Sequence, residues 1–223
     1  MTTPPDPTAQ SGNSEMTRSA LVRASLKLFG QKGFEGTSTR EIAAAARANI
    51  GSIAYHFGGK EGLRAACAAY IVQTVQGVAS QALAAEAAPV DANAARARLH
   101  LAAERLVSFV VARPEAGEIV QFVLREMAHP TDALDTIYDG VFLPVHARLC
   151  GLWAMATGQR AEAEHTKIAV FTMIGQAVYF RIGREAVLRR MGWSEIGPDE
   201  AAKILAVVHA NIDAALSQSG GKP

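Results

Sequence analysis

Basic and hydrogen-bonding side chains gather in one short stretch of the chain, between residues 39 and 60. The residues with this chemistry include Thr39, Arg40, Asn49, Ser52, Tyr55, His56 and Lys60. Arginine, asparagine and serine can hydrogen-bond to base edges, and lysine, tyrosine and histidine can bind phosphate oxygens. The stretch therefore carries the chemistry of recognition rather than of bond cleavage.

Patterns typical of catalysis or metal binding do not occur in the sequence. It contains no glycine-rich phosphate loop, no cysteine and histidine set at metal-ligand spacing and no serine nucleophile elbow. The two cysteines, Cys67 and Cys150, lie in apolar helical contexts typical of buried free thiols. We therefore predict that the protein is not an enzyme and holds no cofactor or metal ion.

Two short helices are predicted to position the recognition side chains. Ser38 and Glu41 have the spacing of a capping box, in which the serine satisfies a free backbone N–H and the glutamate reaches back. Ile42, Ala43 and Ala46 then form a narrow apolar face. This pattern predicts a short helix that begins after Ser38.

The second helix is predicted to begin near Asn49, because asparagine favours helix caps over helix interiors. Ile53 and Phe57 would face inward, which leaves Ile50, Ser52 and Tyr55 on the outer face. A short helix with small and polar outward residues fits the major groove of B-DNA. The pair is therefore a candidate helix-turn-helix over residues 38–57.

The same residues resemble the DNA-binding signature of the tetracycline-repressor (TetR) family. The resemblance rests on Thr39–Ala43, Tyr55–Phe57 and Lys60–Leu63, and it extends from about Thr17 to Leu63. Two positions depart from the family pattern. Arg47 stands where the family usually has glycine in the turn, so we expect a left-handed backbone there. Ala54 stands where an aromatic residue is usual, so one backbone contact would be missing.

The resemblance implies how each residue would meet DNA. Arg40 matches a position that can reach a base edge, Gly51 would permit close approach, and Ile50 could meet a thymine methyl group. The complete predicted DNA-binding set is Thr39, Arg40, Asn49, Ile50, Gly51, Ser52, Tyr55, His56 and Lys60. A single DNA-binding domain of this size would bind DNA weakly. Two copies on one duplex, and hence a homodimer, are therefore implied.

Composition and charge predict an all-α protein with a basic N-terminal module. Apolar residues make up 49% and aromatic residues 6% of the 223 residues, and alanine-rich amphipathic segments favour about nine helices. The net charge is only +1, but residues 15–64 hold eight Lys or Arg against four Glu. We expect a disordered tail at 1–14, a DNA-binding domain at 15–64 and a C-terminal domain at 65–218.

By the same resemblance, the C-terminal domain would supply a dimer interface and a pocket for a small effector. The predicted interface residues, on two apolar stripes, are Ile168, Ile174, Gly175, Val178, Ile204, Val208 and Ile212. The predicted pocket residues are Phe109, Phe122, Arg125, Glu126, Tyr138, Phe142, His146, Phe171, Gln176 and Tyr179. Packing inside one subunit is the alternative for both sets. Leu124–Pro130 also resembles the CecR-like subgroup of these regulators.

The sequence thus predicts a homodimeric, ligand-responsive regulator that binds a double-stranded DNA operator and acts as a repressor. We expect a cytoplasmic location and no membrane partner, because no secretory signal is visible and the uncharged segment Ala65–Ala85 is too polar to span a bilayer. Two alternatives remain open. One is a helical small-molecule binding protein that has lost operator binding, which the departures at Arg47 and Ala54 would allow. The other is a small all-α enzyme.

Overall fold

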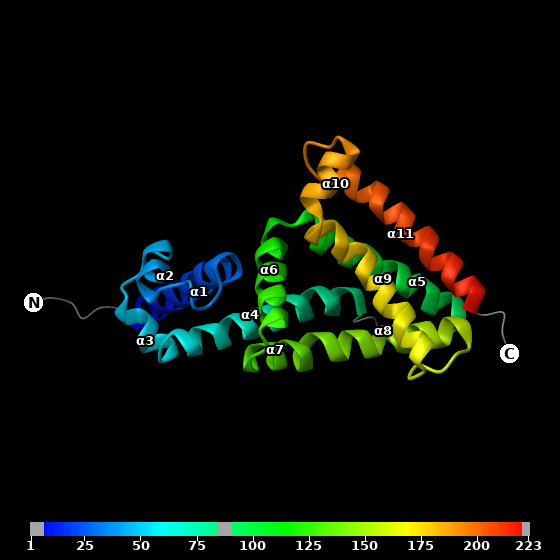
Figure 1. Cartoon of the computed structure of the whole chain (residues 1–223). Helices are drawn as coiled ribbons and strands as arrows, with labels where there is room; N and C mark the ends of the chain where they lie inside the picture. Colours follow the sequence, from blue (N-terminus) through cyan, green and yellow to red (C-terminus); the bar gives the residue numbers. More distant parts are fainter. Residues whose placement is uncertain (1–6, 84–90, 220–223) are drawn as a thin grey trace, which may run out of the picture. The chain divides into compact units, whose positions relative to one another are not determined.

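The chain is helical throughout the part that the computed structural model describes, residues 7–83 and 91–219 (Figure 1). No strand occurs in these residues, as the sequence predicts. The elements are α1 (Pro7–Lys32), α2 (Thr39–Ala45), α3 (Gly51–Phe57), α4 (Lys60–Leu83), α5 (Ala92–Val107), the π-helical segment η1 (Ser108–Ala112), α6 (Pro114–Ala128), α7 (Asp132–Ile137), the π-helical segment η2 (Tyr138–Phe142), α8 (Leu143–Thr157), α9 (Glu164–Ile182), α10 (Arg184–Met191) and α11 (Pro198–Ser219). Because η1 continues α5, and η2 joins α7 to α8, these make ten separate helices in the described residues, close to the nine expected.

The helices form two compact units. Unit 1 contains the described residues up to Gln73 together with Glu118–Ile137, and unit 2 contains Thr74–Gly117 and the chain from Tyr138 onward. The unit that holds the helix-turn-helix is thus larger than the predicted 15–64, because the second half of α6 and all of α7 belong to it. Two continuous helices, α4 and α6, each begin in one unit and end in the other.

Unit 1 is built around the apolar face of α1. Leu21, Leu26 and Phe29 are buried there, and Ile42 from α2 and Ile53 from α3 are buried as well. Their spacing follows the helical period, so each short helix turns one apolar stripe inward. The inward position predicted for Ile53 is confirmed, and the other face of α3 is left to solvent.

The start of α1 differs from the prediction. The helix begins at Pro7, so residues 7–14 of the expected disordered tail are helical, and residues 1–6 lie outside the described part of the chain. Proline is tolerated in the first turn of a helix because its missing N–H has no intrahelical partner to lose. A proline-rich start therefore did not exclude a helix.

Unit 2 has its own core, formed mainly by α5, α8, α9 and α11. Trp153 and Leu149 of α8 pack there with Leu99 of α5, Val170 of α9 and Ile212 of α11. Helices with apolar stripes stabilise one another by burying those stripes together. None of the described helices combines the length and the apolar character that crossing a membrane requires.

Candidate nucleic-acid interface

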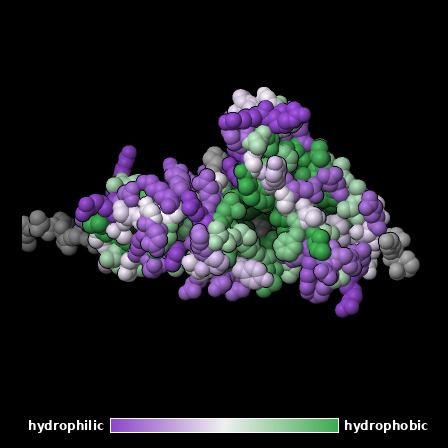
Figure 2. Space-filling model, in the orientation of Figure 1, coloured by the Kyte–Doolittle hydropathy of each residue, from purple (hydrophilic) through white to green (hydrophobic). Residues whose placement is uncertain are grey.

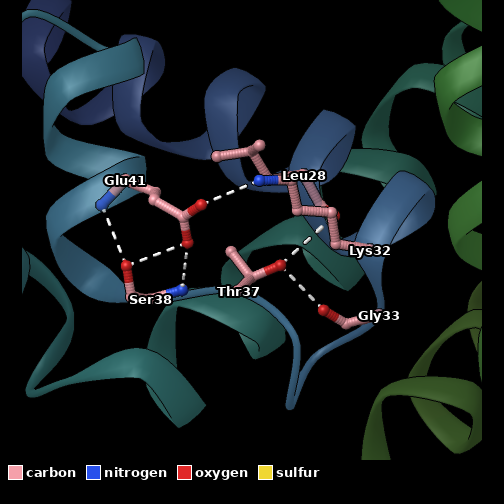
Figure 3. Close-up of polar contacts among 6 residues, drawn as sticks. All are labelled: Leu28, Lys32, Gly33, Thr37, Ser38 and Glu41. Atoms are coloured by element: carbon pink, nitrogen blue, oxygen red, sulfur yellow. Dashed lines mark hydrogen bonds and ion pairs between the residues drawn. The ribbon is translucent and has the colours of Figure 1, made fainter.

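The start of α2 is fixed by the predicted capping box, which is confirmed. The Glu41 backbone N–H donates to Ser38 Oγ at 3.2 Å, and the Ser38 backbone N–H donates to Glu41 Oε2 at 2.9 Å. Lys32 at the end of α1 also donates to Glu41 Oε1 at 2.7 Å (Figure 3). This hydrogen bond, followed by those from Ser38, lowers the pKa of Glu41 to about 2. The first turn of α2 is thus held to α1 by an ionised carboxylate.

The connection between α1 and α2 is anchored by a buried hydroxyl. Thr37 is buried, and its Oγ1 donates to the Gly33 carbonyl at 2.7 Å, with the Leu28 carbonyl at 3.3 Å (Figure 3). The Gly33 carbonyl lies just past the end of α1, where a carbonyl has no intrahelical partner, and the Leu28 carbonyl lies one turn before that end. Thr37 therefore ends α1 and sets the point at which α2 starts, with Thr39 and Arg40 in its first turn.

The outer face of α3 presents the predicted groove-facing residues. Tyr55 is 83% exposed and Ile50 is 49% exposed, whereas Ile53 is 2% exposed. The N-cap residue of α3 is Ile50, one residue after the predicted Asn49, whose Oδ1 instead accepts a hydrogen bond from the Gly51 backbone N–H at 2.8 Å just before the helix. The helix ends at Gly58, whose φ of 72° is left-handed. The sequence prediction of a short, protruding second helix is confirmed.

The remaining predicted DNA-binding residues differ in how freely they reach solvent. Arg40 and Gly51 are exposed, and Thr39 and Ser52 are half-buried. His56 is half-buried against Tyr55, with ring centroids 4.9 Å apart. The Lys60 Nζ lies 4.1 Å from the centre of the Phe34 ring. The Lys60 ammonium group is therefore partly engaged within unit 1, and its role as a phosphate contact stays a prediction.

The turn between α2 and α3 has the left-handed residue that the sequence predicts. Arg47 has φ of 53°, and no other non-glycine residue in the described ranges has positive φ. Two hydrogen bonds close the turn: Arg47 N–H donates to the Ala44 carbonyl at 3.1 Å, and Ala48 N–H donates to the Ala43 carbonyl at 2.9 Å. They hold the arginine in the conformation that glycine adopts at least cost.

Three predicted pocket residues instead pack or hydrogen-bond inside unit 1. The Phe122 ring lies 6.4 Å from that of Phe29. Arg125 donates from Nε to the Gly30 carbonyl at 3.2 Å and from its terminal nitrogen to the Gln31 carbonyl at 3.0 Å. Glu126 is buried and accepts a hydrogen bond from Thr131 Oγ1. Phe122 and Arg125 thus contact α1, and Glu126 binds a residue just after α6, so a pocket shared with the residues of unit 2 stays a prediction.

The sequence did not predict this packing of α6 on α1. A Cβ added at Gly30 would lie 3.1 Å from Gln121 Cβ, so the two helices approach closely where glycine leaves room. A depression of about 520 Å³ opens beside this contact. It is lined by Gly30, Gln31, Gln121, Leu124, Arg125, Ala128 and His129. The signal in the sequence was the adjacent pair Arg125 and Glu126 beside apolar residues, which indicated a polar network or a ligand contact without naming its partner.

The other seven predicted pocket residues lie in unit 2, and the structure brings only some of them together. The rings of His146 and Phe171 stack with centroids 4.0 Å apart. Gln176 Oε1 accepts a hydrogen bond from Asn211 Nδ2 at 2.8 Å, so its partner is on α11. Phe109 is buried, Phe142 is half-buried, and Tyr138 and Tyr179 are exposed. A pocket formed by these residues stays a prediction.

The predicted interface residues divide into buried and exposed sets. Ile204, Val208 and Ile212 of α11 are buried in the core of unit 2, so they cannot contact a second chain; this part of the prediction is corrected. Their stripe is the one that faces their own subunit. Ile174 and Val178 are half-buried, whereas Ile168 and Gly175 of α9 are exposed.

The exposed face of α9 forms a continuous apolar row. Its members are Ile168, Phe171, Gly175, Tyr179 and Ile182. They recur at intervals of three or four residues, which places them on one side of the helix. Figure 2 shows hydrophobic residues gathered in the region of α9. Exposed apolar rows of this length are typical of surfaces that bind another protein.

Two family models match the chain. The model described as "Bacterial regulatory proteins, tetR family" matches residues 21–67, which contain α2 and α3. The model of the C-terminal domain of the HTH-type transcriptional dual regulator CecR matches residues 95–218. The chain is also 34% identical to the HTH-type transcriptional dual regulator CecR of Shigella flexneri over 205 residues, which cover 89% of this chain and 91% of that protein.

Solved structures have the same fold. AibR in complex with isovaleryl coenzyme A and operator DNA has a TM-score of 0.65 at 18% identity, and the match covers 87% of this chain and 97% of that one. A TetR-like transcriptional regulator from Rhodococcus sp. RHA1 has a TM-score of 0.65 at 17% identity, over 92% of this chain and 97% of that one. The family-model matches, the near full-length similarity to a regulator and the exposed helix-turn-helix agree. The chain belongs to the TetR family of bacterial transcription regulators, in the group that carries the CecR C-terminal domain, and its relatives are regulators rather than enzymes.

Proposed function

We propose that this DNA-binding regulator recognises a palindromic operator as a homodimer, represses transcription from it and is released by a small effector. The observation that carries the proposal is the outer face of α3, where Ile50 and Tyr55 protrude while Ile53 holds the helix to the core of unit 1. Arg40 lies in the first turn of α2, so side chains of both α2 and α3 can donate hydrogen bonds to DNA. Such a pair supports one helix in the major groove and its neighbour at the phosphate backbone.

The dimer is supported by the exposed row on α9. Phe171, Tyr179 and Ile182 are each more than half exposed, which is costly for a side chain of this size unless a partner covers it. Gly175 lies at the middle of the row and lets two helices approach closely. A two-fold interface uses the same surface on both subunits, so one self-complementary row is sufficient.

Effector binding is proposed for unit 2. A solved neighbour, AibR, binds isovaleryl coenzyme A and operator DNA, which supports a ligand site in this fold without identifying the ligand of the present chain. Because α4 and α6 each belong to both units, a ligand that favours one arrangement of unit 2 can change the position of α3. The ligand must bind the non-DNA-binding conformation more tightly, with a coupling of about 1–3 kcal/mol.

We also propose that the protein is located in the cytoplasm, where the DNA that it binds would be.

A gel-shift experiment tests the proposal. The wild-type protein is incubated with the promoter region next to its own gene and with duplexes selected from a random pool, and its mass in solution is measured in parallel. We expect a retarded complex, a selected site with two-fold symmetry and a dimeric mass. A protein that binds small molecules but neither the promoter nor any selected duplex would support the ligand-binding alternative, which the strained Arg47 and the small Ala54 favour.

A further inference from the structure

Arg47 occupies a conformation that its side chain makes costly. Its φ of 53° lies in the left-handed region, where a Cβ atom crowds the following carbonyl and glycine is the cheaper residue. The turn needs this conformation, because the hydrogen bonds to the Ala44 and Ala43 carbonyls end α2 there. Arginine therefore stabilises the folded turn less than glycine would.

The Arg47 side chain gains nothing inside the described structure that offsets this cost. It is exposed, and within residues 7–83 and 91–219 its guanidinium forms no hydrogen bond, ion pair or ring contact. The nearest carboxylate along α2, that of Glu41, is paired with Lys32 and Ser38. The backbone of Arg47 is thus held by the turn, and its positive charge has no anion among the described residues.

The position of Arg47 indicates which anion it meets. It lies two residues before Asn49, Ile50 and Gly51, which are exposed and lead into α3. The backbone hydrogen bonds of the turn fix its Cα beside that end of the helix. A helix that lies in a DNA groove has phosphates on both sides of its entry, and a guanidinium binds phosphate oxygens with two N–H groups at once.

We propose that Arg47 is a DNA-backbone contact, which binds a phosphate beside the first turn of α3 and is kept at this position at the expense of turn stability. The inference rests on the proposed function, because it assigns one further residue to the same DNA-binding surface. It also changes the interpretation of the arginine itself. At this position the departure from glycine adds a DNA contact, instead of weakening DNA binding.

The test compares three substitutions in the full chain. Arg47→Gly removes the charge and relieves the backbone, Arg47→Ala removes the charge and leaves the strain, and Arg47→Lys keeps the charge. Each variant is titrated by fluorescence anisotropy against a labelled duplex selected by the wild-type protein and a shuffled duplex of the same composition. Thermal unfolding is recorded for each. Arg190→Ala, which removes an exposed charge from unit 2, is the matched control.

We expect Arg47→Gly and Arg47→Ala to weaken binding to both duplexes equally, by roughly tenfold for a dimer that loses two phosphate contacts. The slope of log affinity against log salt should fall by about 0.9 per lost contact, and hence by about 1.8 per dimer. Arg47→Lys should keep most of the slope, and Arg190→Ala all of it. Arg47→Gly alone should raise the unfolding midpoint, by about 2–4 °C for a chain of this size.

Three results would overturn the inference while leaving the proposed function intact. They are wild-type affinity and slope in both charge-removing variants, a loss in Arg47→Gly that Arg47→Ala does not share, and a loss confined to the selected duplex. Wild-type affinity and slope would show that Arg47 makes no DNA contact. A loss in Arg47→Gly alone would assign the effect to the protein backbone of the turn, and a loss confined to the selected duplex would assign it to a base contact. If the wild-type protein binds no duplex at all, the proposed function fails and the inference fails with it.

Discussion

Arg125 is predicted to hold the second half of α6 to the end of α1, and its replacement by alanine measures how firmly. Its two hydrogen bonds reach the Gly30 and Gln31 carbonyls at 3.2 and 3.0 Å. Hydrogen bonds to charged groups contribute about 1.5–3 kcal/mol each, and solvent reduces this contribution here because Arg125 is exposed. Gln31 is exposed, so water can replace that contact, whereas Gly30 is buried and its carbonyl would lose a partner. We therefore expect Arg125→Ala to cost about 1–2 kcal/mol, nearer the cost of one bond than of two.

That cost corresponds to a fall of about 2–8 °C in the thermal midpoint, measured by the helical circular dichroism signal. Arg189→Ala is the control, because Arg189 is exposed and pairs with the exposed Glu185 within α10. Such a pair contributes about 0.3–0.5 kcal/mol. Arg125→Lys should be intermediate, since a single ammonium group does not reproduce the two-armed contact. If Arg125→Ala unfolded at the same temperature as Arg189→Ala, water would satisfy both carbonyls and Arg125 would not be a clamp.

Three further predictions concern DNA binding, pH and assembly. Arg40→Ala should cost about 1–3 kcal/mol of operator affinity and relax specificity at one base pair, whereas Lys60→Ala should weaken all duplexes alike and flatten the salt dependence; competition titrations with base-substituted duplexes separate the two outcomes. Because the pKa of Glu41 is lowered from 4.5 to about 2 in the folded state, its contribution to stability is present above pH 4.5 and is lost as pH falls through 2. Glu41→Gln should therefore lower stability at neutral pH and flatten the acid limb of the stability curve, measured by urea unfolding between these pH values; an unchanged limb would contradict the assignment. Phe171→Glu places a charge in the exposed row of α9 and should shift the solution mass from dimer to monomer without loss of helix content, while a dimeric variant would show that the interface lies elsewhere.

Local patterns in the sequence predicted the site better than distant ones. The capping box of Ser38 and Glu41 depends on residues three positions apart, so spacing is sufficient to identify it. The left-handed turn at Arg47 followed from the family resemblance over the same short stretch. The contact between Arg125 and Gly30 joins residues far apart in the chain, and nothing in the composition of either helix names the other. The sequence could therefore flag Arg125 as unusual but could not give its partner.

The stripe on α11 illustrates a second limit. Ile204, Val208 and Ile212 have the spacing of one apolar face, but periodicity does not tell whether that face meets its own core or a second subunit. The structure assigns it to the core and leaves Ile168 and Phe171 of α9 exposed. Both helices carry apolar residues beyond those that one core can bury. Only the three-dimensional structure shows which apolar residues of α9 and α11 lie in the core and which are exposed.

The size of the Arg125 contact bears on how an effector would act. A clamp of about 1–2 kcal/mol between α6 and α1 is similar to the coupling of about 1–3 kcal/mol typical of allosteric proteins. An effector in unit 2 that displaces α6 must either move α1 with it or break this contact. If α1 moves, α2 moves too, because Thr37 and the Lys32–Glu41 pair bind the start of α2 to the end of α1. Loss of Arg125 would then leave DNA affinity without ligand nearly unchanged and reduce the response to effector, which is the behaviour expected of a coupling residue rather than of a DNA contact.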